Sequence, residues 1–236
     1  MNLEQASQLN RLLSLLPQSE YLQIAPHLRL VNLSSGQILY EPNEPILTVY
    51  FPIHAMISLV QIMENGVTLE AGIVGSDGML GHPVYLGGQC DSSRAVVQIP
   101  GKAIALEALM LKKTFDQGKT TQKLLLRYTQ AFIAQVSQTA VCNRFHSTKT
   151  RLARWLLQAQ DSAQSSSLQL TQDFLSSMLG TRRASVTVAA NALQDDGLIR
   201  YGRGQIEIID RDGLKRSCCM CYDTVNAEYD RLLPVE

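Results

Sequence analysis

The clearest pattern of apolar and polar positions lies in residues 170–209, LTQDFLSSMLGTRRASVTVAANALQDDGLIRYGRGQIEII. Two short stretches with helical spacing flank a turn at Gly180, where glycine tolerates positive φ at little cost. Ser176 is small, at a position where the two helices must approach closely. The apolar positions that can form one buried face are Leu175, Leu179, Val186 and Leu193. The pattern predicts two helices around a tight turn.

The next segment predicts a β-hairpin. Residues 197–199 lead into a first strand, a glycine-rich turn carries Arg203, and a second strand over 205–208 alternates apolar and polar residues. A hairpin in this place is a wing, and a basic wing tip suits the phosphates of a nucleic-acid backbone. We therefore predict a winged helix-turn-helix. A helical hairpin that touches no nucleic acid is the alternative at this point.

The start of the second predicted helix carries the candidate chemistry. Thr181 is placed to cap this helix, and Arg182, Arg183 and Ser185 are placed to project from its first turn. In a helix-turn-helix the first turn of the second helix enters the major groove, where arginine reads base edges. These positions favour a DNA-binding regulator.

Between Leu30 and about Leu109 the pattern changes to short β-like runs. The runs cover residues 37–40, 48–52, 56–63, 67–74 and 94–99. They are separated by turn residues such as Glu-Asn-Gly at 64–66 and Gly-Ser-Asp-Gly at 75–78. Several strands at this spacing predict a compact all-β sandwich or barrel.

A long helix is predicted from about Thr120 to Asn143. Its apolar stripe is wider than one sheet contact requires, so we interpret it as a seam between two chains that packs partly on the β region. Leu125, Phe132 and Val136 are the predicted seam residues. A helix that only packs domains together is the alternative. Another helix is predicted over residues 148–160.

Charge is unevenly distributed along the chain. Its 236 residues carry no formal net charge, which by itself argues against nucleic acid. Residues 144–216, however, hold eleven basic and seven acidic side chains, whereas residues 1–143 hold nine basic and ten acidic ones. The basic surplus therefore falls on the predicted winged helix. It is modest, so strong binding would require a dimer to double it.

Membrane and secretion signals are not recognisable in the sequence. It has no run of eighteen or more apolar residues, and residues 1–22 lack the basic start and continuous apolar stretch of a signal peptide. We expect a cytoplasmic protein without a membrane partner.

Cysteine and histidine positions do not predict a metal or catalytic site. The odd number of cysteines argues against a disulfide framework, and Cys218, Cys219 and Cys221 have no matching histidine or second cysteine pair near them in sequence. Metal binding or redox sensing there is the minority interpretation, against buried or idle thiols. The four histidines are scattered, and no nucleophile elbow or P-loop is present. We expect no bound metal and no enzyme activity.

The whole chain resembles the CRP/FNR family of bacterial transcription regulators. The resemblance is carried by Leu170-Thr171, Gly180, Arg183, Val186, residues 197–199 and the run Arg-Leu-Ala-Arg-Trp-Leu-Leu at 151–157. It implies an α+β fold. The implied parts are a cyclic-nucleotide-binding-like antiparallel β-roll over 1–112, a dimerisation helix over 113–143 and a winged helix-turn-helix over 144–236. It also implies a homodimer on double-stranded DNA, with RNA polymerase as a candidate partner.

Family roles transfer to individual residues of the second helix. Arg183 matches an arginine that reads guanine, a contact worth about 1–3 kcal/mol of discrimination. Thr171, Arg182 and Ser185 match positions that contact phosphate. Two positions depart from the family pattern, because Ala184 replaces a frequent glutamate and Val188 replaces a second base-reading arginine. Val188 offers only an apolar contact, for example to a thymine methyl group, so a different operator is expected.

The implied effector pocket departs further. Family members that bind cyclic nucleotides carry a Gly-Glu pair, where this chain has Gly78-Met79, and an Arg-Ser or Arg-Thr pair, from which Arg94 is displaced by one residue. Asp77 is the candidate replacement for the missing carboxylate, Arg94 is still a candidate for a phosphate, and Gly78 and Met79 complete the set of candidate effector contacts. We therefore do not expect cAMP or cGMP, and both another small effector and no effector stay open. An iron–sulfur sensor is not expected, because no cysteine precedes Cys90.

Two classes of function remain. The first is a dimeric regulator that reads a pseudo-palindromic operator. In it, a change in the β region would alter the packing of the two long helices and act through a hinge at residues 142–146. The second is a ligand-sensing module that acts through protein partners.

Overall fold

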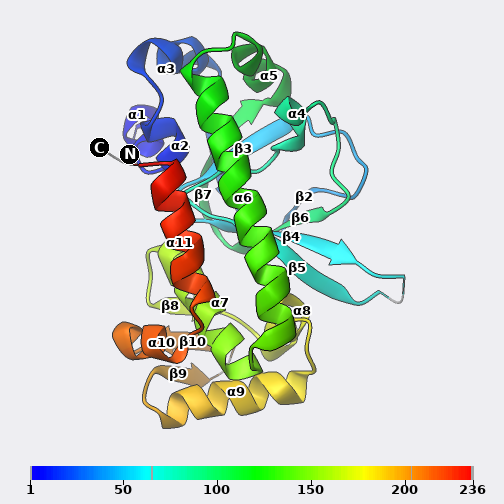
Figure 1. The fold of residues 1–236 in the computed structure, drawn as a ribbon, viewed down its shortest axis with the longest axis vertical. Coiled ribbons are helices and arrows are strands. Elements are labelled where there is room, and N and C mark those ends of the chain that lie inside the picture. Colours follow the sequence, from blue (N-terminus) through cyan, green and yellow to red (C-terminus); the bar gives the residue numbers. More distant parts are fainter. Residues whose placement is uncertain (1, 65, 203, 235–236) are drawn as a thin grey trace.

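The computed structural model describes residues 2–64, 66–202 and 204–234. The N-terminal part begins with three short helices, continues as strands with one helical turn between them, and ends in two helices (Figure 1). Its elements are α1 (Leu3–Ser7), α2 (Arg11–Ser14), α3 (Gln18–Ile24), η1 (Ala25–His27), β1 (Arg29–Leu33), β2 (Ile38–Tyr40), β3 (Thr48–Pro52), β4 (Met56–Ile62), β5 (Thr68–Val74), α4 (Pro83–Leu86), β6 (Arg94–Ile99), β7 (Gly101–Glu107), α5 (Ala108–Asp116) and α6 (Thr120–Phe145).

The C-terminal part is a helical unit with a small sheet. Its elements are α7 (Thr148–Ala163), β8 (Ser167–Gln169), α8 (Gln172–Met178), α9 (Arg183–Asp195), β9 (Ile199–Gly202), β10 (Gln205–Ile208), α10 (Arg211–Ser217) and α11 (Cys221–Leu232). The α+β fold predicted from the sequence is confirmed, with antiparallel sheets, one long helix and a helix-turn-helix followed by a hairpin. The set of predicted strands was incomplete, because β1, β7 and β8 were not among them.

Two antiparallel sheets form the β-roll. One has the order β1-β7-β3 and the other β2-β6-β4-β5. Successive side chains of β4 point to opposite sides of the sheet, and apolar side chains lie on both sides. Ile57 and Leu59 lie in the core of the roll, whereas Met56 and Val60 lie in the core shared with the C-terminal part. The C-terminal part is therefore packed directly on the four-stranded sheet.

We call this contact the sheet junction, and its residues include Leu69, Glu70, Gln98, Trp155, Met178 and Gly180. Trp155 of α7 is fully buried and its Nε1 donates to Glu70 Oε1 of β5 at 3.0 Å. Glu70 also accepts a hydrogen bond from the Ser58 hydroxyl. Burial raises the pKa of Glu70 to about 7, although the hydrogen bonds from Ser58 and Trp155 act in the opposite direction.

The last helix returns to the N-terminal part. Figure 1 shows α11 alongside α6, and we call α11 the C-terminal strap. Its apolar side chains lie in the core of the β-roll: Val225, Tyr229, Leu232 and the following Leu233. Arg11 of α2 donates to the Leu233 carbonyl at 2.7 Å and pairs with Asp230 at 2.9 Å. The predicted unit 144–236 therefore contains a strap that was not predicted from the sequence. The apolar side chains of this strap pack in the core of the N-terminal part.

No helix formed by the described residues is long and apolar enough to cross a membrane.

Candidate nucleic-acid interface

The turn between α8 and α9 has the predicted geometry. Gly180 adopts φ 54°, and the Thr181 amide donates to the Ser176 carbonyl at 3.0 Å. The buried Arg151 of α7 donates through its guanidinium to the Leu179 carbonyl in the same turn. This arginine therefore supports the turn from inside the domain. The predicted apolar face is buried as expected: Leu175, Leu179, Val186 and Leu193.

Thr181 does not cap α9, so this sequence-based expectation is wrong. Helical geometry begins one residue later, and the N-cap residue is Arg182, with φ −71° and ψ 144°. The Arg182 side chain makes no capping hydrogen bond within the described chain. The first turn of α9 is consequently left without a side-chain acceptor, and amide groups of this kind bind anions readily.

Arg183 is exposed and held in place. Its side chain is 63% exposed, its Nε donates to Gln172 Oε1 at 3.2 Å, and a terminal nitrogen lies 3.3 Å from Asp173 Oδ1. Both partners belong to the first turn of α8. Arg183 thus projects from the surface at the point where α8 and α9 meet.

The other predicted contact residues occupy the same surface with different exposure. Val188 is 69% exposed on α9. Ser185 is half-buried, and the exposed Thr171 caps α8 by accepting from the Phe174 amide at 3.2 Å. Arg203, the predicted wing contact, lies outside the described residues. On the wing, Arg200 pairs across the strands with Glu207 at 2.8 Å.

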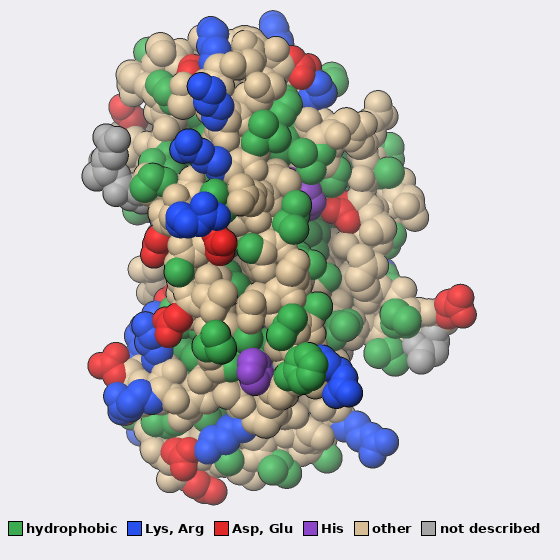
Figure 2. Space-filling view, in the orientation of Figure 1, with side chains coloured by type: hydrophobic (Ala, Val, Ile, Leu, Met, Phe, Trp, Pro, Cys, Tyr) green, Lys and Arg blue, Asp and Glu red, His purple; other side chains and the backbone are tan. Residues whose placement is uncertain are grey.

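Basic side chains occur over the lower part of the molecule, where α7 to α10 lie, and acidic ones lie among them (Figure 2). The surface is therefore mixed rather than uniformly basic, as the modest charge surplus of this segment predicted.

Residues 150–217 match the family of the Crp-like helix-turn-helix domain. The chain carries a Crp-like helix-turn-helix. The match begins within α7 and ends at α10, so it contains the Arg151 support, the turn and the wing. Comparison with curated protein sequences gives no match.

Solved structures with this fold cover most of the chain. FixK2 from Bradyrhizobium japonicum has a TM-score of 0.66 at 15% identity, covering 81% of this chain and 98% of that one. A CRP/FNR family transcriptional regulator from Thermus thermophilus has a TM-score of 0.61 at 23% identity, covering 80% and 97%. The c-di-GMP responsive regulator CLP from Xanthomonas campestris has a TM-score of 0.62 at 14% identity, covering 81% and 99%. The resemblance to CRP/FNR regulators found in the sequence is thereby confirmed for the Crp-like domain and the overall fold.

The four predicted effector residues do not surround one space. Met79 is fully buried, and its carbonyl accepts from the Tyr128 hydroxyl of α6 at 2.7 Å. A Cβ added to Gly78 would lie 2.5 Å from the Tyr128 ring. Arg94 is held by Glu41 at 2.8 Å. The expectation that Gly78 and Met79 contact an effector is therefore corrected, because Tyr128 occupies the space beside them.

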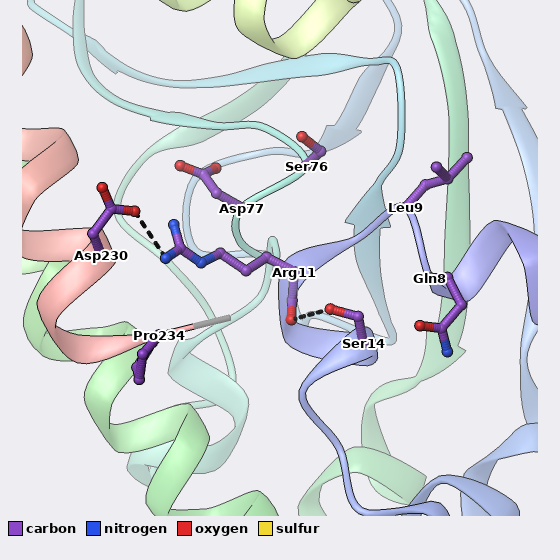
Figure 3. A pocket seen from close by; sticks show the side chains of 8 residues that line it. All are labelled: Gln8, Leu9, Arg11, Ser14, Ser76, Asp77, Asp230 and Pro234. Carbon is purple, nitrogen blue, oxygen red and sulfur yellow. Dashed lines mark hydrogen bonds and ion pairs between the residues drawn. The ribbon is translucent and has the colours of Figure 1, made fainter. Parts of the chain in front are cut away.

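Asp77 lines a cavity of about 560 Å³ where the N-terminal helices meet the C-terminal strap. Figure 3 shows the Arg11 side chain reaching toward Asp230, with Asp77 beside it. Burial raises the pKa of Asp77 above its ordinary value. The single guanidinium is already paired with Asp230, so the lining offers no unpaired cation to a phosphate group. This cavity suits a nucleotide poorly.

The predicted seam residues of α6 lie inside the chain. Leu125 and Phe132 are buried, Val136 is half-buried, and a Cβ on Gly72 of β5 would contact both Phe132 and Val136. This face of α6 packs on the β-roll, so Leu125 and Phe132 are not available to a second chain, and the expectation that they form the seam is corrected. Val136 is only partly covered, and its place in a seam stays a prediction. The outward face of α6 carries other apolar side chains: Leu126, Ile133, Val141 and Phe145.

The structure also brings together residues that sequence spacing kept apart. The side chains of Cys142, His146, Cys219 and Cys221 meet where α6 ends and the strap begins. No histidine or second cysteine pair lies near Cys219 in the sequence, because the four residues come from segments far apart in the chain. The spacing Cys-x3-His at 142–146 was a usable signal, since residues four apart lie on the same side of a helix.

Proposed function

We propose that this protein is a homodimeric, DNA-binding transcription regulator of the CRP/FNR type. The observation that carries the proposal is the exposed start of α9 within a Crp-like helix-turn-helix. Arg182 and Arg183 stand at the first turn of this helix, which has no side-chain cap. Uncapped amides and two guanidinium groups provide the phosphate and base-edge donors that major-groove binding needs. Such a protein acts on chromosomal DNA, which supports a cytoplasmic location.

Individual roles follow from position. Arg183 would read a guanine, Val188 would contact an apolar base edge, and Arg182, Ser185 and Thr171 would contact phosphates. Thr181 precedes the helix and is half-buried, so only the exposed part of its side chain would contact the DNA backbone. Arg203 would contact a phosphate from the wing. Asp173 holds Arg183 in the free protein and would have to release it to the base.

A salt titration of DNA binding tests this role. We expect a selected operator to bind with an affinity that falls steeply with salt, and Arg183→Ala to lose about tenfold or more in preference for that operator, in line with about 1–3 kcal/mol for a guanine contact. Lys112→Ala is the matched control, because it removes one positive charge from α5, in the N-terminal part. Selection from random DNA that enriches no sequence would favour the alternative, a sensing module that acts through protein partners.

The second chain would pack on the outward face of α6. Leu126 and Ile133 are one heptad apart and are 46% and 59% exposed, and Val141 and Phe145 extend the stripe toward the helix-turn-helix. Figure 2 shows apolar side chains in a broken line down the front of the molecule, over α6. An exposed apolar stripe on a long helix can pack on its own copy across a two-fold axis. This seam replaces the one predicted from the sequence.

Sedimentation velocity tests the seam. Ile133→Glu should convert the dimer to a monomer, because it places two like charges across the axis in an apolar contact. Leu22→Glu is the matched control, since Leu22 on α3 is also 59% exposed. A wild-type chain that is strictly monomeric would overturn the proposed seam.

The N-terminal region, residues 1–112, would be the sensor, residues 113–143 the dimer helix and residues 144–236 the DNA-binding part with its strap. No cyclic nucleotide is assigned, because Tyr128 occupies the space beside Gly78 and the Asp77 cavity lacks an unpaired cation. An effector of another kind would act by altering the packing of α6 against its copy. RNA polymerase is a candidate partner of the complex on DNA. Cross-links between the two α9 helices would report any such change.

A further inference from the structure

Four side chains from two distant segments converge at the lower end of α6. Cys142 and His146 come from the last turn of α6 and its C-cap, and Cys219 and Cys221 flank the start of the strap. Their sulfur and ring-nitrogen atoms all lie within 4.8 Å of one another. Cys142, Cys219 and Cys221 are buried and His146 is half-buried.

The distances match those around one metal ion. Cys142 Sγ lies 3.5 Å from Cys219 Sγ, and Cys221 Sγ lies 3.4 Å from His146 Nδ1. With zinc–sulfur bonds of about 2.3 Å and zinc–nitrogen bonds of about 2.0–2.1 Å, a tetrahedral site has ligand–ligand edges of about 3.5–3.8 Å. Two of the ligand–ligand distances are already close to this length, and since all four atoms lie within 4.8 Å of one another, the longest distance would shorten by about 1 Å on binding. An iron–sulfur cluster would require its ligands to stand much further apart.

Three thiolates and one imidazole are a typical ligand set for structural zinc. We propose that Cys142, His146, Cys219 and Cys221 bind one divalent ion of the zinc class in a closed tetrahedral site. On binding, the three thiols release their protons to solvent and the neutral imidazole coordinates through Nδ1. No electron transfer is involved.

The surroundings of the four ligands support the proposal. Gln138 of α6 donates from Nε2 to Cys221 Sγ at 3.1 Å, a hydrogen bond that would orient and stabilise a thiolate ligand. Three thiolates and a dication carry one net negative charge. The Arg154 guanidinium is buried, its Nε has no hydrogen-bond partner within the described chain, and it lies close enough to act electrostatically on Cys142. The loaded site would place a negative charge near this buried and incompletely hydrogen-bonded cation.

The ion would join parts of the chain that move separately in the unfolded state. It would link the end of α6, the hinge before α7 and the start of the strap, and so fix the strap to the helix that enters the DNA-binding part. Because the site exists only in the folded chain, metal binding should stabilise that chain. The inference does not depend on DNA binding.

Cobalt and zinc titrations of the full-length, reduced protein test the site. We expect one Zn²⁺ per chain, and Co²⁺ in its place should give the visible bands of tetrahedral coordination together with thiolate-to-metal charge transfer. Cys219→Ser and His146→Ala should each lower Zn²⁺ affinity by about tenfold or more. Zinc should raise the Tm of the wild type and leave that of Cys219→Ser nearly unchanged.

Cys218→Ser is the matched control. Cys218 is adjacent to a proposed ligand, but it is not one of the four clustered residues, and its thiol donates to the Cys219 carbonyl. This variant should bind one Zn²⁺ with wild-type affinity.

The cobalt spectrum of the wild type needs no variant, so it tests the site even if Cys219→Ser fails to fold. Wild-type protein that takes up no Zn²⁺ or Co²⁺ under reducing conditions, or a cobalt spectrum without thiolate charge transfer, would overturn the proposal. Recovery of a Cys142–Cys219 disulfide in place of metal binding would do so as well.

Discussion

Two junctions hold the DNA-binding part to the rest of the molecule, and they differ in chemistry. The sheet junction buries Trp155 and Glu70 in a continuous apolar core and uses a protonatable carboxyl group as its polar contact. The junction at the strap uses thiols and an imidazole at the start of α11 and the Arg11–Asp230 ion pair near its end. The first should respond to protons and packing and the second to metal. One domain can thus be held by two contacts that separate under different conditions.

The largest expected effect concerns packing at the sheet junction. Trp155→Ala should lower the free energy of unfolding by about 3–5 kcal/mol, because it empties a fully buried site and removes the donor to Glu70. Urea denaturation measures the change. Trp155→Phe keeps most of the packing and should cost only about 1–3 kcal/mol for the lost donor. Equal losses in the two variants would show that the hydrogen bond, rather than packing, dominates this junction.

The next effect concerns protons. The pKa of Glu70 rises from 4.5 in the unfolded chain to about 7, so the folded state binds the proton more tightly. The contribution of Glu70 to stability is fully present below pH 4.5 and is lost as the pH rises through 7, by about 3 kcal/mol in all. Glu70→Gln cannot ionise and should flatten this part of the pH profile, measured by urea denaturation between pH 5 and pH 8. An identical slope in the variant would place the titrating group elsewhere.

The smallest expected effect concerns the strap. Asp230→Asn removes the ion pair with Arg11, but the Asp230 side chain is 72% exposed, so the cost should lie below about 1 kcal/mol. Raising the salt concentration should reduce the difference from wild type further. Denaturation in low and high salt measures it. A cost comparable with that of Trp155→Ala would mean that the strap, and not the sheet junction, holds the domain.

The sequence predicted the parts of the fold that depend on nearby residues. The turn at Gly180 and the apolar face of α8 and α9 were predicted because their contacts lie within about twenty positions. The strands were predicted from the turn residues between them. The prediction of the helix cap was wrong, because the backbone geometry makes Arg182, and not Thr181, the N-cap residue of α9.

Contacts between distant segments could not be predicted. Cys142 and Cys219 are 77 positions apart, and only the return of the strap along α6 brings them together. The predicted seam residues lie on the face that packs on the β-roll, because apolar side chains occur on both the inner and the outer face of α6. A single sequence cannot distinguish the face that packs on its own β-roll from the face left exposed.

Trp155 is the only tryptophan in the chain, and it lies at the sheet junction. Its fluorescence therefore reports on one place in the molecule without any label. An indole in an apolar core emits at shorter wavelength than one in water, so separation of the domain from the sheet should shift the emission to the red. The same spectrum, recorded while DNA, acid or zinc is added, would show whether the domain leaves the sheet before the chain unfolds.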